Sequence, residues 1–388
     1  MFIISPNDNT FAVCGTICQD DTIAAMQKRF LCLLLLLAGC QPSNNRDVPS
    51  PAIPSVAFTA SIAPTLTPSP TPTVAQLIHP YTIDGLRHHF FQSGSVHIRA
   101  LLEQTDIYTR YLIDYPSDGL TITAIMQVPK NGHAPFPVIV MNHGFFPRAS
   151  YASGDGTWRA AEYLNKYGYL TLASDYRSWG KSDIGPSFFY SGLAIDVINL
   201  MNAIPSIPQA DPSRIGIWGH SMGGGVTLKV LEVDSSLKAA VLYSTVSGDD
   251  ADILARWGLG CIGDIASGEL RLGCNSSDIV PLDLLSNLIQ AYKDSSTDSN
   301  LLRQISPIYH LDLVAAPVEI NYGTKDGQTL SGTPPDWSKK LYQAFKDAGK
   351  DATLFAYEGE YHSFNGDAWL AFMDRTRQFF DQYVKSAP

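Results

Sequence analysis

From about residue 108 onward, short apolar runs alternate with segments of helical periodicity. Tyr108–Tyr115 and Leu120–Pro129 flank Pro116–Gly119, whose turn-forming residues predict a β-hairpin. The apolar runs predict further strands at 136–142, 169–175, 215–218, 238–244, 317–322 and 352–357. Helical spacing predicts helices over about 158–167, 193–204 and 367–384. This alternation predicts an α/β fold with a mainly parallel sheet covered by helices on both faces.

The pattern Gly219-His-Ser221-Met-Gly223 stands between a short apolar strand and a helix that runs to about Glu232. A serine on a tight strand-to-helix turn has a strained backbone, and small residues two positions to either side make that turn possible. The turn lifts the Ser221 hydroxyl above the sheet edge, beside the free N–H groups of the helix N-terminus. We therefore predict that Ser221 is a nucleophile, rather than a residue that only caps the helix.

A serine nucleophile needs a base, and the base needs a carboxylate to orient it. Asp326 follows the strand that ends near Tyr322, and His362 lies just before the last helix. Because catalytic groups of open parallel sheets gather at the carboxyl ends of the strands, we predict a Ser221–His362–Asp326 triad. Asp249 or Asp250, after the preceding strand, is the alternative acid.

The tetrahedral intermediate of acyl transfer needs two N–H donors. We predict that one is the amide of Met222, the residue after the nucleophile, and that the other is the amide of Phe145, with Phe146 as the alternative. His143, in the same loop, is expected to support the loop rather than to transfer a proton.

The stretch between Ser247 and about Pro307 interrupts the alternation of strands and helices. Its length exceeds that of one connecting helix, so we expect a cap inserted over the site at about 247–307. Cys261 and Cys274 lie in this segment and are candidates for a disulfide bond in an exported protein.

The N-terminal region has the pattern of an export signal. We expect residues 1–25 to be untranslated or unstructured, with Met26 as the better start. Residues 26–39 combine a short basic region, an apolar run and small residues before Cys40, and the apolar run is too short to span a bilayer. Residues 40–78 are rich in Pro, Ser and Thr, which predicts an extended linker ahead of a hydrolase-type domain at 79–388.

Composition narrows the class of function. The formal net charge of −10 gives no basic surface for nucleic acid, and 45% hydrophobic residues suffice for a large core. No Cys/His cluster has zinc spacing, since His88-His89 is too short a pattern, and we expect neither a metal nor another cofactor.

Two resemblances follow from these motifs. Leu37-Ala-Gly-Cys40 resembles the lipobox of bacterial lipoproteins, which implies lipidation of Cys40 and a protein anchored to the outer face of the cell membrane. From about Tyr108 to the end the chain resembles the α/β-hydrolase superfamily, and within it the prolyl-oligopeptidase-like (S9-type) catalytic domain and the dienelactone-hydrolase group. This resemblance rests on four motifs: Asp211–Gly224, Asp175–Asp183, Gly323–Asp326 and His362–Phe364.

The resemblance implies an α/β-hydrolase fold with a cap insertion and a serine hydrolase that works through an acyl-enzyme. We favour an ester substrate over a peptide, because the chain has no room for the β-propeller of proline-specific members, and His143 stands near the position of their oxyanion-loop tyrosine. An S9-type peptidase and a non-catalytic binding lipoprotein are the alternatives. The sequence leaves the oligomeric state open.

Overall fold

The structure, a computed structural model, describes residues 71–262, 275–281 and 283–386, and all of these lie in the second of two compact units, Ser69–Pro388. Their central sheet has the strand order β1-β2-β3-β5-β4-β6-β7-β10-β11. The strands from β5 to β11 pair in parallel, whereas β1, β2 and β3 pair antiparallel at one edge. The bounds are β1 His97–Gln104, β2 Tyr108–Ser117, β3 Leu120–Pro129, β4 Phe136–Asn142, β5 Leu170–Ser174, β6 Ala210–His220, β7 Ala239–Tyr243, β10 Val318–Gly323 and β11 Ala352–Tyr357.

The predicted hairpin is formed by β2 and β3, which pair up to Ser117 and Leu120. The two turn residues, Asp118 and Gly119, both have positive φ (50° and 79°). A two-residue turn of this kind matches the right-handed twist of the flanking strands, and Asp-Gly is a favoured sequence for it. The local sequence therefore determines this pairing.

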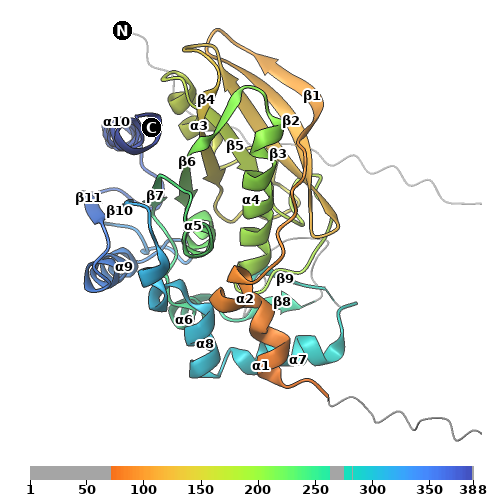
Figure 1. Cartoon of the computed structure of the whole chain (residues 1–388). Coiled ribbons are helices and arrows are strands. Elements are labelled where there is room, and N and C mark those ends of the chain that lie inside the picture. The colour runs from red at the N-terminus through yellow and green to blue at the C-terminus, as the bar shows by residue number, and fades with distance from the viewer. Residues whose placement is uncertain (1–70, 263–274, 282, 387–388) are drawn as a thin grey trace, which may run out of the picture. The chain divides into compact units, whose positions relative to one another are not determined.

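Helices cover both faces of the sheet (Figure 1). One face packs against α4 (Ser191–Ala203), α5 (Met222–Val233) and α9 (Pro335–Asp347). The other packs against α3 (Trp158–Asn165) and α10 (Gly366–Phe380). Every residue of β4 is buried, as expected of a central parallel strand covered on both sides.

Between β7 and β10, where the cap was expected, the chain forms α6 (Asp250–Trp257), β8 (Gly260–Ile262), β9 (Asn275–Val280), α7 (Ser286–Ser295) and α8 (Ser299–Ile305). We call these elements the cap. β8 and β9 pair with each other, separately from the central sheet. Cys274 of the expected disulfide, and the side chain of Cys261, lie outside the described residues.

The folded part begins earlier than the sequence indicated. We expected the linker to continue to residue 78, but Val74–Ile78 forms a helix, α1, which begins with a capping box at Thr73. Ile78 is fully buried with Phe188 and Tyr292, so α1 belongs to the folded unit. A second short helix, α2 (Ile83–Arg87), and strand β1 were also not predicted.

No helix of the described residues is long and apolar enough to cross a bilayer. The expected signal and the lipidation site at Cys40 lie outside the described residues.

Candidate active site

Ser221 lies at the tip of a strained turn between β6 and α5. Its backbone has φ 56° and ψ −122°, a left-handed conformation that costs a non-glycine residue free energy. A side chain at Gly219 would place its Cβ 2.3 Å from the carbonyl oxygen of Gly223, and one at Gly223 would place its Cβ 2.1 Å from that of Asn142. The two glycines of the motif are therefore required by close backbone contacts on both sides of the serine.

The residues predicted as a triad are hydrogen-bonded in the expected order. His362 Nε2 lies 2.9 Å from Ser221 Oγ, and His362 Nδ1 lies 3.0 Å from Asp326 Oδ2. Ser221 follows β6, Asp326 follows β10 and His362 follows β11, so parallel strands deliver all three to one edge of the sheet. In this arrangement Nε2 can accept the serine proton while Nδ1–H stays bonded to the carboxylate.

Three backbone and side-chain donors hold the Asp326 carboxylate in addition to His362. The amides of Gly327 and Thr333 donate to Oδ1 at 2.7 and 2.9 Å, and the Thr333 hydroxyl lies 2.7 Å from Oδ2. Burial alone would raise the pKa of Asp326, but these bonds, with the hydrogen bond and charge of His362, lower it. Asp326 is therefore held as a carboxylate.

The alternative acids do not contact His362. Asp249 caps α6 at the amide of Ala251, and its other oxygen accepts a bond from Lys340 Nζ at 2.8 Å. Asp250 is buried in the first turn of the same helix, where its amide donates to Ser306 Oγ. Asp249 thus connects the cap to Lys340 of α9, whereas the amide of Asp250 bonds within the cap segment.

Two further histidines surround the site without facing the nucleophile. His220 Nε2 donates to the carbonyl oxygen of His362 at 3.1 Å, and its ring stacks on Tyr243. Burial, followed by the charge of His362, lowers the pKa of His220 to about 3, so this imidazole is neutral at working pH. His143 is fully buried between Tyr151 and Tyr176 and contacts two backbone carbonyls, as expected of a residue that supports its loop.

The loop after β4 approaches the nucleophile closely. A Cβ at Gly144 would lie 3.0 Å from the Cβ of Ser221, and Phe145 is half-buried beside it. Met222 is the first residue of α5. Phe145 and Met222 both line the cavity at Ser221, and their roles as oxyanion donors stay predictions. The carbonyl of the alternative residue, Phe146, accepts a bond from Trp179 Nε1 at 2.9 Å.

A cavity of about 330 Å³ opens beside Ser221 and His362. The hydrolase core contributes apolar walls from Phe145, Phe146, Met222 and Val246. The remaining apolar walls are Tyr190, Trp257 and Leu330, and the polar ones include Asn275, Ser277 and Ser331. Among the described lining residues none is Asp, Glu, Lys or Arg, so the cavity favours an uncharged, largely apolar group.

Cap helix α6 is bonded to the loop that carries Asp326. Arg256 Nη2 donates to the carbonyls of Gly327 and Thr329 at 3.2 and 2.7 Å, and Trp257 Nε1 donates to that of Leu330 at 2.7 Å. The Trp257 ring packs edge-to-face on Trp337 of α9. One wall of the cavity is therefore built jointly by the cap and this loop.

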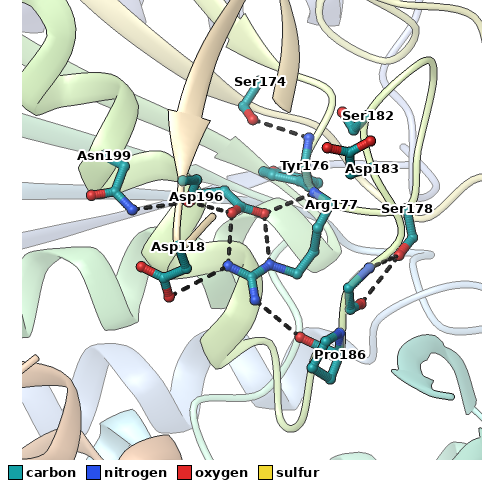
Figure 2. Close-up of polar contacts among 12 residues, drawn as sticks. Asp118, Ser174, Tyr176, Arg177, Ser178, Ser182, Asp183, Pro186, Asp196 and Asn199 are labelled. Carbon is teal, nitrogen blue, oxygen red and sulfur yellow. Dashed lines mark hydrogen bonds and ion pairs between the residues drawn. The ribbon is translucent and has the colours of Figure 1, made fainter. Parts of the chain in front are cut away.

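A buried ion pair fixes the segment between β5 and α4. Arg177 Nε and Nη2 lie 3.0 and 2.8 Å from the two carboxylate oxygens of Asp196, and Nη1 donates to the carbonyl of Pro186 (Figure 2). The Asp118 carboxylate, in the β2–β3 turn, lies 4.0 Å from the same guanidinium. These contacts hold the segment that leads to Tyr190 in the cavity wall.

Within the described residues, no group of three or more His, Cys, Asp or Glu side chains is arranged to hold a metal ion. The chemistry that the described site offers is that of a hydrogen-bonded serine, histidine and carboxylate.

Sequence reasoning missed several residues around the site. Thr333, which holds Asp326, and Tyr190 and Trp257, which line the cavity, follow no motif. Only the Gly/Ser/Thr/Pro-rich composition of 327–334 marked a long loop at this position.

Parts of the chain are similar to known proteins. Residues 134–273 match the family described as "Serine aminopeptidase, S33". Lysophosphatidylserine lipase ABHD12 of Xenopus tropicalis is 33% identical over 96 residues, which is 25% of this chain and 23% of that protein. The chain covers 46% of an uncharacterised 31.7 kDa protein of Escherichia coli, so it spans less than half of these curated relatives.

Two solved structures show the same fold. Acetyl xylan esterase 1 from Thermoanaerobacterium sp. matches with a TM-score of 0.53 at 16% identity, over 80% of this chain and 93% of that one. A puromycin-hydrolysing peptidase of Mycobacterium tuberculosis also matches with a TM-score of 0.53, at 21% identity, over 74% of this chain and 41% of that one.

Proposed function

We propose that the chain is a serine hydrolase of the α/β-hydrolase superfamily, which cleaves carboxylic esters through an acyl-enzyme; the family match over residues 134–273 and the fold shared with an acetyl xylan esterase support this proposal. The observation that carries the proposal is the continuous set of hydrogen bonds from Ser221 through His362 to Asp326. Each of these groups has the partner that its role requires.

In the proposed reaction Ser221 Oγ attacks the ester carbonyl while His362 Nε2 takes its proton. The amides of Met222 and Phe145 stabilise the oxyanion, and His362 then gives the proton to the departing alcohol. A water molecule, deprotonated by His362, attacks the acyl-enzyme, and His362 returns this proton to Ser221 Oγ as the bond to the acyl group breaks and the acid is released. Asp326 keeps Nδ1 protonated and stabilises the imidazolium that forms in each half-reaction.

The cavity favours an ester over an amino-terminal peptide. An aminopeptidase must hold the α-ammonium of its substrate, and a desolvated ammonium needs a carboxylate partner. No described lining residue supplies one. The similarity to a lysophosphatidylserine lipase, whose name describes action on a lipid ester, is in keeping with this preference.

A peptidase is the second candidate, because the matching family is described as a serine aminopeptidase. The full chain should be offered p-nitrophenyl esters of short acids and aminoacyl p-nitroanilides of matched size. We expect kcat/KM for the esters to exceed that for the anilides beyond the difference in intrinsic reactivity, measured with imidazole as the reference catalyst. Faster turnover of the anilides after this correction would establish the peptidase instead.

A protein that only binds ligands is the third candidate, and an active-site probe separates it from both enzymes. A fluorophosphonate should modify Ser221 of the full chain, and His362→Ala should abolish the adduct while the fold is retained. A folded chain without an adduct would favour the binding protein.

We further propose that the protein is exported and held at the outer face of the cell membrane by lipid on Cys40. The lipobox and the Pro-rich residues that follow it support this proposal. Cys40→Ser should release the protein into the medium, and unchanged retention in the membrane fraction would refute the anchor.

A further inference from the structure

Tyr190 forms part of the cavity wall from a strained position. It is the N-cap residue of α4 and has φ 62°, and the preceding Phe189 has φ 51°. Two consecutive aromatic residues in the left-handed region are energetically costly, so surrounding contacts must hold them there. Tyr190 is only 3% exposed, and it lines the cavity at Ser221.

Those contacts come from Asp278 of cap strand β9. Its Oδ2 accepts bonds from the amide of Phe189 at 3.1 Å and from the hydroxyl of Tyr292 at 2.7 Å, and its Oδ1 accepts one from the amide of Tyr190 at 3.4 Å. Asp278 is itself buried, with 4% of its surface exposed. One carboxylate therefore fixes the backbone of both strained residues.

A second residue of the same strand also lines the cavity. Asn275 forms part of the wall together with Tyr190, and its Oδ1 accepts a bond from the amide of Ser277. β9 thus contributes to the wall directly through Asn275 and holds Tyr190 by its backbone amide through Asp278.

We infer that Asp278 is a positioning residue that fixes Tyr190 as the wall limiting the size of the substrate's acyl group, which is uncharged and apolar. This inference rests on the proposed esterase function and names the substrate class of that site. The two parts of the chain that set the limit are the cap, through Asp278, and the start of α4, through Tyr190.

The limit has a measurable consequence. Each methylene that enters an apolar cavity contributes about fourfold to kcat/KM. Beyond the length at which the chain meets Tyr190, further methylenes should contribute nothing or lower kcat/KM. Tyr190→Ala removes the wall, so the chain length at which kcat/KM stops rising should increase.

The experiment uses p-nitrophenyl esters from acetate to dodecanoate with the full chain and four variants: Tyr190→Ala, Asp278→Asn, the double variant, and Asp283→Asn. Asp283 is an exposed carboxylate of the cap, so its variant makes the same change of charge away from Tyr190. We expect Tyr190→Ala to raise the ratio of kcat/KM for decanoate to that for acetate by about tenfold or more. Asp278→Asn should move this ratio in the same direction, and Asp283→Asn should leave it unchanged.

The double variant tests whether Asp278 acts through Tyr190. If it does, Tyr190→Ala with Asp278→Asn has the same chain-length profile as Tyr190→Ala alone. Independent effects of the two substitutions on the profile, or a profile that Tyr190→Ala leaves unaltered, would overturn the inference.

Alkyl fluorophosphonates of increasing chain length provide a second readout. This readout remains usable for a variant whose cap is loosened. The rate at which each modifies Ser221 reports the size of the cavity without any ester turnover. No labelling of the wild-type chain at any length would mean that the proposed function fails. Labelling with the same length dependence in wild type and Tyr190→Ala would mean that the inference alone fails.

Discussion

Thr333 binds both oxygens of the Asp326 carboxylate, with its amide on Oδ1 and its hydroxyl on Oδ2. The same hydroxyl lies 2.9 Å from the carbonyl of Ser244 and 3.3 Å from His362 Nδ1. The Thr333 hydroxyl therefore lies between Asp326, His362 and the residue that follows β7.

Thr333→Val removes this hydroxyl and keeps the shape of the side chain. A hydrogen bond to a charged group contributes about 1.5–3 kcal/mol, so we expect kcat/KM to fall by roughly 10- to 100-fold. Thr333→Ser keeps the donor and should retain most of the activity. Equal losses in the two variants would assign Thr333 a packing role only.

The same substitution should alter the dependence of stability on pH. The pKa of Asp326 is lowered in the folded chain, so its ionisation stabilises the fold above the unfolded pKa, and this stability is lost as pH falls through the folded pKa. Thr333→Val removes one of the groups that lower this pKa. As pH is lowered, the Tm of Thr333→Val should therefore begin to fall at a higher pH than the Tm of wild type. The Tm of Thr333→Ser should fall over the same pH range as that of wild type.

Asp326→Asn tests the role of the acid itself. An amide at this position favours the wrong tautomer of His362, with Nε2 protonated and unable to accept the serine proton. We expect kcat to fall by about four orders of magnitude while KM changes little. A loss below tenfold would show that another carboxylate orients His362, and Asp249→Asn would then be the next variant to measure.

His220 provides a control within the site, because its hydrogen bond to His362 goes to the backbone carbonyl, and the two rings only pack against each other with centroids 4.9 Å apart. Its pKa of about 3 means that it carries no charge in the range where the enzyme is assayed. His220→Leu should lower kcat by up to about tenfold through loss of a neutral hydrogen bond, without shifting the pH profile. A shift of the acidic limb of the pH profile of kcat in His220→Leu would show that His220 takes part in proton transfer.

The Arg177–Asp196 pair should govern stability rather than chemistry. Asp196→Ala leaves a buried guanidinium without its main partner, which costs about 3–5 kcal/mol. We expect Tm to drop by roughly 6–20 °C, since 1 kcal/mol shifts Tm by about 2–4 °C in domains of 150–250 residues. The exposed pair Lys339–Asp336 supplies the control, and Asp336→Ala should leave Tm nearly unchanged.

Asp278 should make stability depend on pH in the opposite direction from Asp326. Burial raises the pKa of Asp278 to about 6. The bonds to Tyr292, Phe189 and Tyr190 and the charge of Lys229 lower this pKa by less than burial raises it. Asp250 is buried nearby and also has a pKa of about 6, raised mainly by burial and in part by Asp278. A raised carboxyl pKa favours the folded state at low pH, and this contribution is lost as pH rises from about 4 through 6.

The matching measurement compares thermal melts of wild type and Asp278→Asn across this range. The stability of wild type relative to the variant should decrease as pH rises, because only wild type must ionise the buried carboxyl of Asp278. A difference in Tm that stays constant from pH 4 to 8 would contradict the raised pKa.

Local patterns determined much of the fold. The hairpin of β2 and β3, the buried strand β4 and the turn at Ser221 each carry their signal within about a dozen residues, and the structure has them where the sequence predicted them. The sequence grouped Ser221, His362 and Asp326 because each follows a predicted strand that ends at the same edge of the sheet, and in the structure the three side chains are hydrogen-bonded in series.

The missed features depend on contacts distant in sequence. β1 shows no alternation of apolar and polar residues, since nearly all of its side chains are exposed on both faces. α1 has only five residues, too few for a helix to be stable by itself even with its capping box at Thr73, and it depends on packing against the cap. Asp278 and Tyr190 are 88 positions apart, so no local pattern reveals their bond.

The bonds from Arg256 and Trp257 of α6 to the Gly327–Leu330 segment make the cap and the Asp326 loop one mechanical unit. A group bound in the cavity that displaces Trp257 or Leu330 also displaces the loop in which Gly327 and Thr333 hold the Asp326 carboxylate. We therefore expect the fit of the bound group to affect the alignment of His362. Grafting another cap onto this core would alter turnover together with selectivity, even though the triad belongs to the core alone.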